Sequence, residues 1–143
     1  MALPARADLD AIFLEEDAVL AIMPEGHPLA EMPRFPLKGL EAEPFLLMEK
    51  GGKNEISEIF ERHHLHPDVK FVTWDDYAIM SMVENGLGIA ILPALVLKRA
   101  PYRIAKRVLE VPAFRKIGVA LRDAGAAPLA IKRFLEYLKF RSQ

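Results

Sequence analysis

The feature that most constrains the fold is the spacing of apolar residues between residues 44 and 92, which alternates between a strand pattern and a helical pattern. Apolar runs typical of buried strands lie at Pro44–Glu49 and Ile89–Leu92, and a third strand is predicted where apolar residues alternate around Phe71. The two segments between these strands follow a helical period. One helical face carries Ile56, Ile59, Phe60 and His63, and the other carries Ala78, Ile79, Met82 and Val83.

This strand, helix, strand, helix, strand order predicts an α/β fold. Its strands should be mostly parallel, joined by right-handed crossovers and buried on both faces between flanking helices. Residues with capping preferences stand at the expected boundaries: Asn54 before the first helix, Asp75 or Asp76 before the second, and Gly86 after it.

Further elements are predicted on both sides of this core. Ala18–Met23 reads as a short buried strand closed by a Pro-Glu-Gly turn, and two more strands are expected at Arg107–Val111 and Ile117–Leu121. A final helix should begin at Pro128, because proline fits the first helical turn. Its apolar stripe comprises Ile131, Phe134, Leu135 and Leu138.

Composition limits the classes of function. The chain has 143 residues, of which 52% are hydrophobic, enough to bury the core of a globular domain. Its 19 Lys and Arg are interspersed among 20 Asp and Glu, so no basic stripe predicts tight DNA binding by these residues alone. There is no cysteine to form a disulfide or a thiolate metal site.

The same sequence predicts a cytoplasmic protein without a membrane partner. The first residues include Arg6, Asp8 and Asp10 and lack the apolar region of a signal peptide. The longest uncharged apolar stretch, Gly86–Leu97, is interrupted by Pro93 and is shorter than the roughly 20 residues that span a bilayer.

Three motifs in fixed order resemble the effector domain of LysR-type transcriptional regulators. They are Glu16–Pro24 (EDAVLAIMP), Gly26–Ala30 (GHPLA) and Val83–Pro93 (VENGLGIAILP), with Pro44-Phe45-Leu46 between them. With the amphipathic C-terminal helix, the resemblance extends from Leu9 to Leu138. It implies a fold like that of type 2 periplasmic binding proteins, in which two α/β lobes hold a small effector between them. It also implies a DNA-binding helix-turn-helix head, which these residues do not contain.

In the family's layout, residues 1–14 would be a remnant of the first lobe and residues 15–111 the second, effector-binding lobe. Residues 112–143 would return through a crossover to a strand and helix of the first lobe. The resemblance implies a hinge in the two crossing segments, at Glu15 and Glu16 and at Pro112 and Ala113. Because partner elements of the first lobe would be missing, we expect exposed apolar faces and a homodimer or higher oligomer.

Ligands of open α/β sheets gather beyond the carboxyl ends of strands, which singles out two loops. The first contains Lys50, Gly51, Gly52 and Asn54, where free amides of a helix start and the lysines, Lys53 included, could hold an anion. The second contains Trp74, Asp75, Asp76 and Tyr77, and the resemblance implies effector contact there. The alternatives are an ordinary loop with an asparagine cap and, for the two aspartates, helix caps. These loops predict a small organic anion as effector.

Other motifs carry weaker functional signals. Gly86-Leu87-Gly88 follows a helix and precedes a strand, the reverse of a dinucleotide-binding order, so we interpret it as a cap and turn. His63, His64 and His66 lie at a helix end without the spacing of a metal site, and His27 should make a turn contact. The serines at 57, 81 and 142 lack a nucleophile-elbow sequence. We therefore expect no catalytic residue, metal or cofactor.

Two alternatives to a transcriptional regulator stay open from sequence. A solute-binding lobe of a transport system shares the implied fold but normally carries an export signal, which is not seen here. An enzyme on the same two-lobed fold would need a reactive group at the cleft, and no positive sign of one is present.

Overall fold

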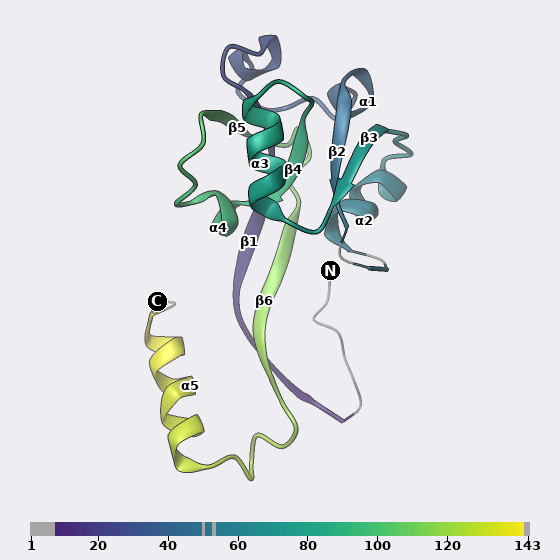
Figure 1. Ribbon diagram of the computed structural model, residues 1–143. Helices are drawn as coiled ribbons and strands as arrows, with labels where there is room; N and C mark the ends of the chain where they lie inside the picture. The colour runs from purple at the N-terminus through teal and green to yellow at the C-terminus, as the bar shows by residue number, and fades with distance from the viewer. Residues whose placement is uncertain (1–7, 50, 53, 142–143) are drawn as a thin grey trace. The chain divides into compact units, whose positions relative to one another are not determined.

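The computed structural model describes residues 8–49, 51–52 and 54–141, and Lys50 and Lys53 lie outside them. The chain divides into two compact units (Figure 1). Unit 1 comprises Met1–Asp17 and Arg115–Gln143, and unit 2 comprises Ala18–Phe114. No helix in the described residues is long and apolar enough to cross a membrane.

Unit 2 contains a sheet whose middle strand is the second half of β1 (Asp10–Pro24). It pairs antiparallel with β4 (Ala90–Pro93) on one side and β5 (Ile104–Val108) on the other, so that Ala21 lies opposite both Ile91 and Arg107. The end of β1 is buried because both of its edges are covered and its side chains enter the core.

The second sheet consists of β2 (Pro44–Met48) and β3 (Asp68–Thr73), which run parallel. A parallel bridge between Phe45 and Ile89 connects β2 to the segment before β4. Two hydrogen bonds make this connection: the Leu46 N–H donates to the Ile89 carbonyl and the Ile89 N–H to the Pro44 carbonyl, each at 2.9 Å.

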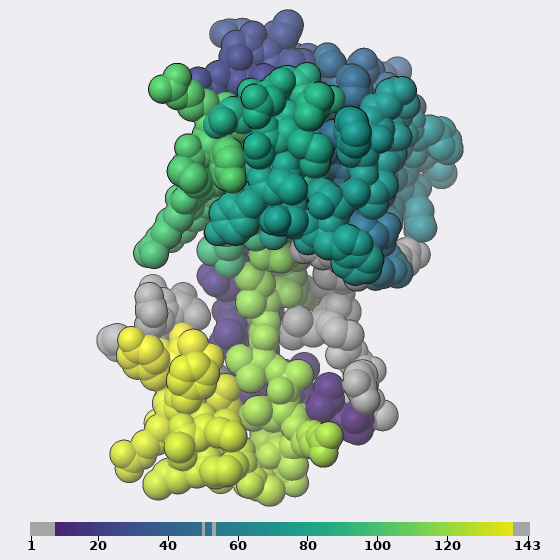
Figure 2. All heavy atoms as spheres, viewed as in Figure 1, coloured from purple at the N-terminus to yellow at the C-terminus, as the bar shows by residue number. Residues whose placement is uncertain are grey.

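The two longer helices of unit 2 begin at the predicted caps, and α3 ends before the predicted glycine. The cap of α2 (Glu55–Arg62) is Asn54, and that of α3 (Asp76–Glu84) is Asp75. Gly86 has φ +78°, and the Leu87 N–H bonds back to the Met82 carbonyl, which is the hydrogen-bonding pattern of a glycine-terminated helix. In Figure 2 the teal surface of α3 and β3 forms part of the face of unit 2 turned to the viewer.

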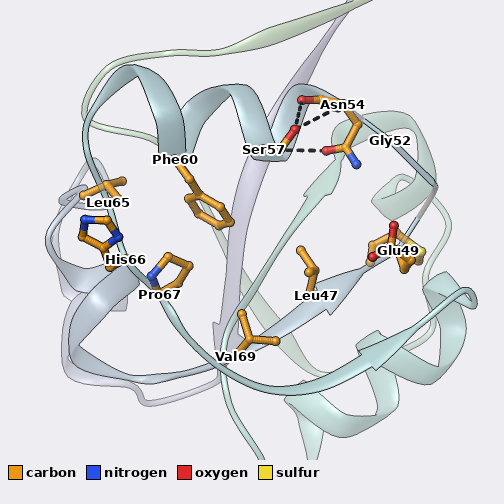
Figure 3. Close-up of a pocket in the computed structure, with 11 residues that line it drawn as sticks. Leu47, Glu49, Gly52, Asn54, Ser57, Phe60, Leu65, His66, Pro67 and Val69 are labelled. Carbon is orange, nitrogen blue, oxygen red and sulfur yellow. Dashed lines mark hydrogen bonds between the residues drawn. The ribbon is translucent and has the colours of Figure 1, made fainter.

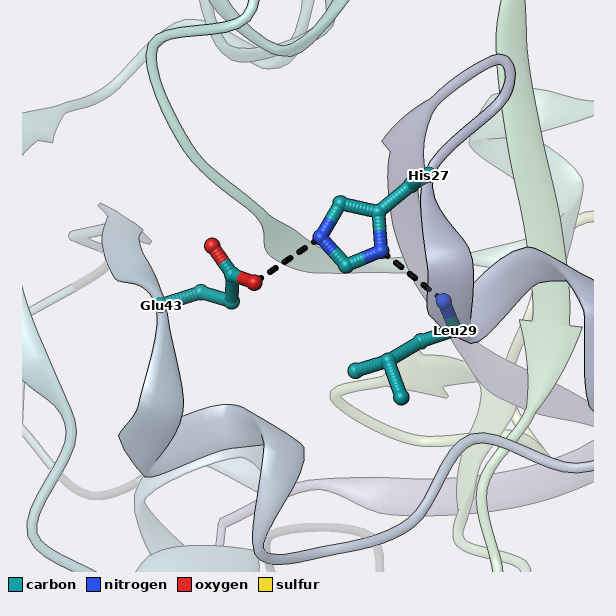
Figure 4. Close-up of polar contacts among 3 residues, drawn as sticks. All are labelled: His27, Leu29 and Glu43. Carbon is teal, nitrogen blue, oxygen red and sulfur yellow. Dashed lines mark hydrogen bonds and ion pairs between the residues drawn. The ribbon is translucent and has the colours of Figure 1, made fainter.

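The shorter elements η1 (Pro28–Glu31), α1 (Gly39–Ala42) and α4 (Ala94–Leu97) complete unit 2. His27 makes the expected turn contact: its Nδ1 accepts the Leu29 N–H at 3.1 Å, and its Nε2 lies 3.0 Å from the Glu43 carboxylate (Figure 4). Since a backbone N–H can only donate, the proton of a neutral ring is on Nε2 and donates to Glu43.

The α/β class is confirmed, but two expectations about the sheets are wrong. β1 runs antiparallel to β4 and β5, so the strands are mixed rather than mostly parallel. β3 is not buried on both faces, since Val69, Phe71 and Val72 are 39%, 48% and 55% exposed. The reason is that β3 is an edge strand: within the described residues it pairs with β2 on one side and with no strand on the other.

Element boundaries also differ from the expectations. β1 begins at Asp10 rather than Ala18, β5 ends at Val108 rather than Val111, and β6 begins at Phe114 rather than Ile117. The buried face of α3 comprises Ile79, Met80 and Val83, whereas Ala78 and Met82 are half-buried.

Unit 1 contains the first half of β1, most of its pairing partner β6 (Phe114–Leu121) and α5 (Leu129–Arg141). The Arg115 Nε donates to the Asp17 carboxylate at 2.9 Å, and the Asp17 side chain is almost fully buried. On α5, Leu135 is buried, whereas Ile131 and Phe134 are 38% and 57% exposed, so much of the predicted apolar stripe is uncovered in this chain.

Candidate functional site

The two loops singled out from the sequence begin side by side. Met48 at the end of β2 is the register partner of Thr73 at the end of β3, and the Glu49 N–H donates to the Thr73 carbonyl at 2.9 Å. Because β2 and β3 are parallel, both loops leave the sheet at the edge formed by the carboxyl ends of its strands, and each leads into a helix start. This edge is where ligands of open α/β sheets gather.

In the first loop, the protein's own side chains already occupy the helix start. Asn54 Oδ1 accepts the N–H groups of Ile56 and Ser57, each at 3.0 Å, and Ser57 Oγ accepts the Asn54 N–H at 2.9 Å. This capping box satisfies amides that an anion would otherwise use. Gly51 and Gly52 have φ +72° and +69°, and both are exposed. Lys50 and Lys53 lie outside the described residues.

The second loop combines a capped helix start with exposed aromatic side chains. Asp75 Oδ1 accepts the Tyr77 N–H at 2.9 Å, so this carboxylate caps α3. Trp74 and Tyr77 are 75% and 61% exposed, and both could lie against a ligand or another protein surface. Asp76 Oδ1 is buried and has no hydrogen-bond partner among the described residues.

A groove of about 370 Å³ lies beside the first loop, between α2 and the β2–β3 sheet (Figure 3). It includes two of the residues predicted to contact an effector, Gly52 and Asn54, but none from the second loop. Its other lining residues are Leu47, Met48, Glu49, Ser57, Phe60, Leu65, His66, Pro67 and Val69.

Sequence reasoning missed this groove for a physical reason. The helical and strand periods of Phe60 and Val69 indicate which residues share a face, but they do not show whether that face is fully covered. Among the described residues, no group of three or more His, Cys, Asp or Glu could hold a metal ion.

Comparisons with known proteins identify what the chain resembles. Residues 1–142 match the family described as the LysR substrate binding domain. The uncharacterized HTH-type transcriptional regulator YvbU of Bacillus subtilis is 28% identical over 136 residues, which cover 92% of this chain and 46% of YvbU.

Two solved structures share the fold. HinK, a LysR family transcriptional regulator from Pseudomonas aeruginosa, has a TM-score of 0.84 at 19% identity, over 99% of this chain and 51% of HinK. The effector binding domain of QuiR in complex with shikimate has a TM-score of 0.81 at 18% identity, over 99% of this chain and 68% of that domain. The chain thus spans about half the length of YvbU and HinK.

Proposed function

We infer the function from the family, since this chain belongs to the LysR substrate binding domain family. We propose that it is the ligand-sensing part of a transcriptional regulator. In this proposal a small organic effector binds between two lobes, of which unit 2 is one. Its binding alters the lobes' relative angle and so biases how attached helix-turn-helix heads sit on DNA, with the regulator acting as a homodimer or higher oligomer.

The observation that carries the proposal is the shared origin of the two loops at one sheet edge. The Glu49–Thr73 hydrogen bond fixes the start of one loop against the start of the other. Rigid strand ends that present adjacent loops are suited to hold a ligand in a defined orientation. We propose that Gly51, Gly52 and Asn54 of the first loop, and Trp74 to Tyr77 of the second, line the effector site.

We further propose a small organic anion as the effector. The sequence places Lys50 and Lys53 on either side of the glycine pair, so the first loop carries two cations. Both helix starts are capped by Asn54 and Asp75, so the lysines rather than free helix amides would supply most of the attraction. The exposed ring of Trp74 would then pack against the apolar part of the ligand. This is a binding role without catalysis.

The hinge of this mechanism is proposed at Glu15 and Glu16 and at Pro112 and Ala113. The boundaries between the compact units fall close to both pairs, after Asp17 and after Phe114. Pro112 and Ala113 lie outside regular secondary structure, between β5 and β6, where backbone dihedral angles can change without breaking a helix or strand.

Isothermal titration of the full-length regulator with small carboxylates, shikimate and benzoate among them, tests the proposal. Tyr77→Ala should weaken binding of the effector at least about tenfold, because it removes an exposed ring from the site. Leu87→Ala is the matched control, since Leu87 is an exposed apolar residue just beyond the other end of α3 and should change affinity less than about twofold. Equal effects of the two substitutions would contradict the assigned site.

A further inference from the structure

We propose that unit 2 carries a second interaction surface, a weak and sequence-independent contact for the phosphate backbone of DNA. The surface is formed by residues 98–103, which connect α4 to β5 and are called the basic segment below. In Figure 1 the segment is the green stretch that follows α4. The choice of DNA rests on the function proposed above, in which attached heads hold the chain beside an operator.

Charge is segregated along the chain around the basic segment. Five of the 19 Lys and Arg lie within residues 85–109, whereas all 20 Asp and Glu lie outside that range. Three of the five, Lys98, Arg99 and Arg103, belong to the segment and are exposed. Lys106 and Arg107 are half-buried and donate to backbone carbonyls. The net charge of -1 for the whole chain therefore conceals a positive region.

The three exposed cations are not neutralised by carboxylates. Every Asp and Glu of the chain is among the described residues, and none of them forms an ion pair with Lys98, Arg99 or Arg103. Like charges gathered without a counter-charge repel one another, and a polyanion relieves that repulsion. The surface is therefore complementary to a partner with several negative charges.

The spacing of these cations suits one strand of a duplex. The Cα atoms of Lys98 and Arg103 are five residues apart, so they are separated by at most about 18 Å. That span corresponds to about five successive phosphates at 3.4 Å per base step. Lys106 on β5 adds positive charge beside the α4 end of the segment, because its Nζ donates to the Leu97 carbonyl at 3.0 Å.

Two carboxylates lie near the other end of the segment. Glu84 Oε2 accepts the Arg103 backbone N–H at 2.6 Å. Glu25 follows Pro24, which is the register partner of Ile104. The positive charge at Arg103 is thus partly offset, and Lys98 and Arg99 supply most of the attraction for phosphate.

The basic segment lacks the apolar centre of a protein interface. Its exposed residues are the three cations and Pro101, and its aromatic residue, Tyr102, is half-buried against the core. Leu95 on α4 is 42% exposed, but a single aliphatic side chain does not form an interface centre. Protein interfaces concentrate aromatic side chains and are depleted in lysine. Contacts to DNA phosphates consist largely of lysine and arginine.

Two or three phosphate contacts give weak binding by this chain alone, in keeping with the absence of a basic stripe in the sequence. The contact gains effect once the attached heads are bound, because a tethered surface meets nearby DNA at an effective concentration of about millimolar. Its expected role is to favour those arrangements of unit 2 in which the segment faces the duplex.

NMR titration of the ¹⁵N-labelled 143-residue chain with a 20-base-pair duplex of arbitrary sequence tests the contact. We expect the amide signals of residues 98–103 to shift in 20 mM salt. Each phosphate contact contributes a slope of about -0.9 to the dependence of log affinity on log salt, so the affinity should fall about tenfold between 20 and 60 mM salt.

A matched pair of double variants assigns the binding to the segment. Lys98→Gln with Arg99→Gln should weaken binding at least about tenfold in 20 mM salt and reduce the magnitude of the salt slope by about 2. Arg34→Gln with Lys38→Gln removes the same two charges from exposed positions elsewhere on unit 2. This control should change the slope by less than about 0.5.

Equal effects of the two double variants, or no shift of residues 98–103 at low salt, would overturn the surface. A polyglutamate peptide that bound as tightly as the duplex at equal charge concentration would assign the segment to an acidic protein and overturn the choice of DNA. The duplex titration uses no effector and the effector titration uses no DNA, so a failure of either proposal is distinguishable from a failure of the other.

Discussion

Alanine at Gly88 should destabilise unit 2 severely, because backbone fills the space that its side chain would need. A Cβ at this position would lie 2.5 Å from the Pro44 carbonyl oxygen and 3.3 Å from the Leu46 Cγ. The first contact is roughly 1 Å shorter than nonbonded heavy atoms prefer. Pro44 cannot withdraw freely, since its carbonyl accepts the Ile89 N–H and the neighbouring Leu46 N–H bonds to Ile89.

The expected cost is about 3 kcal/mol. Overpacking of a closely packed site costs about 1–3 kcal/mol, and distortion of a backbone hydrogen bond adds about 1 kcal/mol. Gly86→Ala is the matched control: it has open space around the new Cβ and only the positive φ of +78° to penalise it, for about 1 kcal/mol.

Urea unfolding followed by circular dichroism measures both changes. With a slope of about 2 kcal/mol per molar urea, the midpoint should fall by about 1.5 M in Gly88→Ala and by about 0.5 M in Gly86→Ala. A midpoint for Gly88→Ala equal to or above that of Gly86→Ala would refute the reasoning, since it would mean that the connection between β2 and the start of β4 yields easily.

Three further substitutions test single features by the same urea assay. His64→Gly should raise the free energy of unfolding by about 0.5–1 kcal/mol, because glycine relieves the strain of the left-handed His64 backbone, at φ +53°, but adds unfolded-state entropy; a decrease would show that the His64 side chain makes a stabilising contact. Asn54→Ala should lower the free energy of unfolding by about 1 kcal/mol through loss of the capping box, and an unchanged midpoint would mean that solvent replaces the cap. Asp17→Asn should lower it by about 3 kcal/mol, because Arg115 would keep its charge beside a buried neutral amide; a cost below about 0.5 kcal/mol would place the ion pair in a well-solvated environment.

The sequence predicted local features of unit 2 more accurately than its long-range pairing. Asn54, Asp75 and Gly86 act as helix caps because capping depends on a few neighbouring backbone groups, which are visible in a short window. The antiparallel course of β1 was not visible, since alternation along a strand is the same whichever direction its neighbours run. The edge position of β3 was missed for the same reason: apolar residues such as Phe71 predict a strand without specifying how many partners it has.

The sequence predicted that the two loops would start together, but not the state of the helix starts behind them. The parallel order of β2 and β3 was enough to place the two loops at one edge. The sequence could not show whether the helix amides behind these loops were free, because Asn or Asp at a helix start can cap the helix or contact a ligand. Their cap hydrogen bonds of 2.9–3.0 Å answer that question for the folded chain.

These caps constrain how a ligand can be recognised at the sheet edge. A ligand anion that bonded to the amides of Ile56 and Ser57 would have to displace Asn54 Oδ1, and the cap it displaces is worth about 1 kcal/mol. An anion that instead paired with Lys50 or Lys53 would leave the cap intact and lose nothing of the helix's stability. For the anionic effector proposed above, recognition through side chains would therefore be the less costly route, and affinity would depend on lysine charge and on salt concentration more than on the helix dipole.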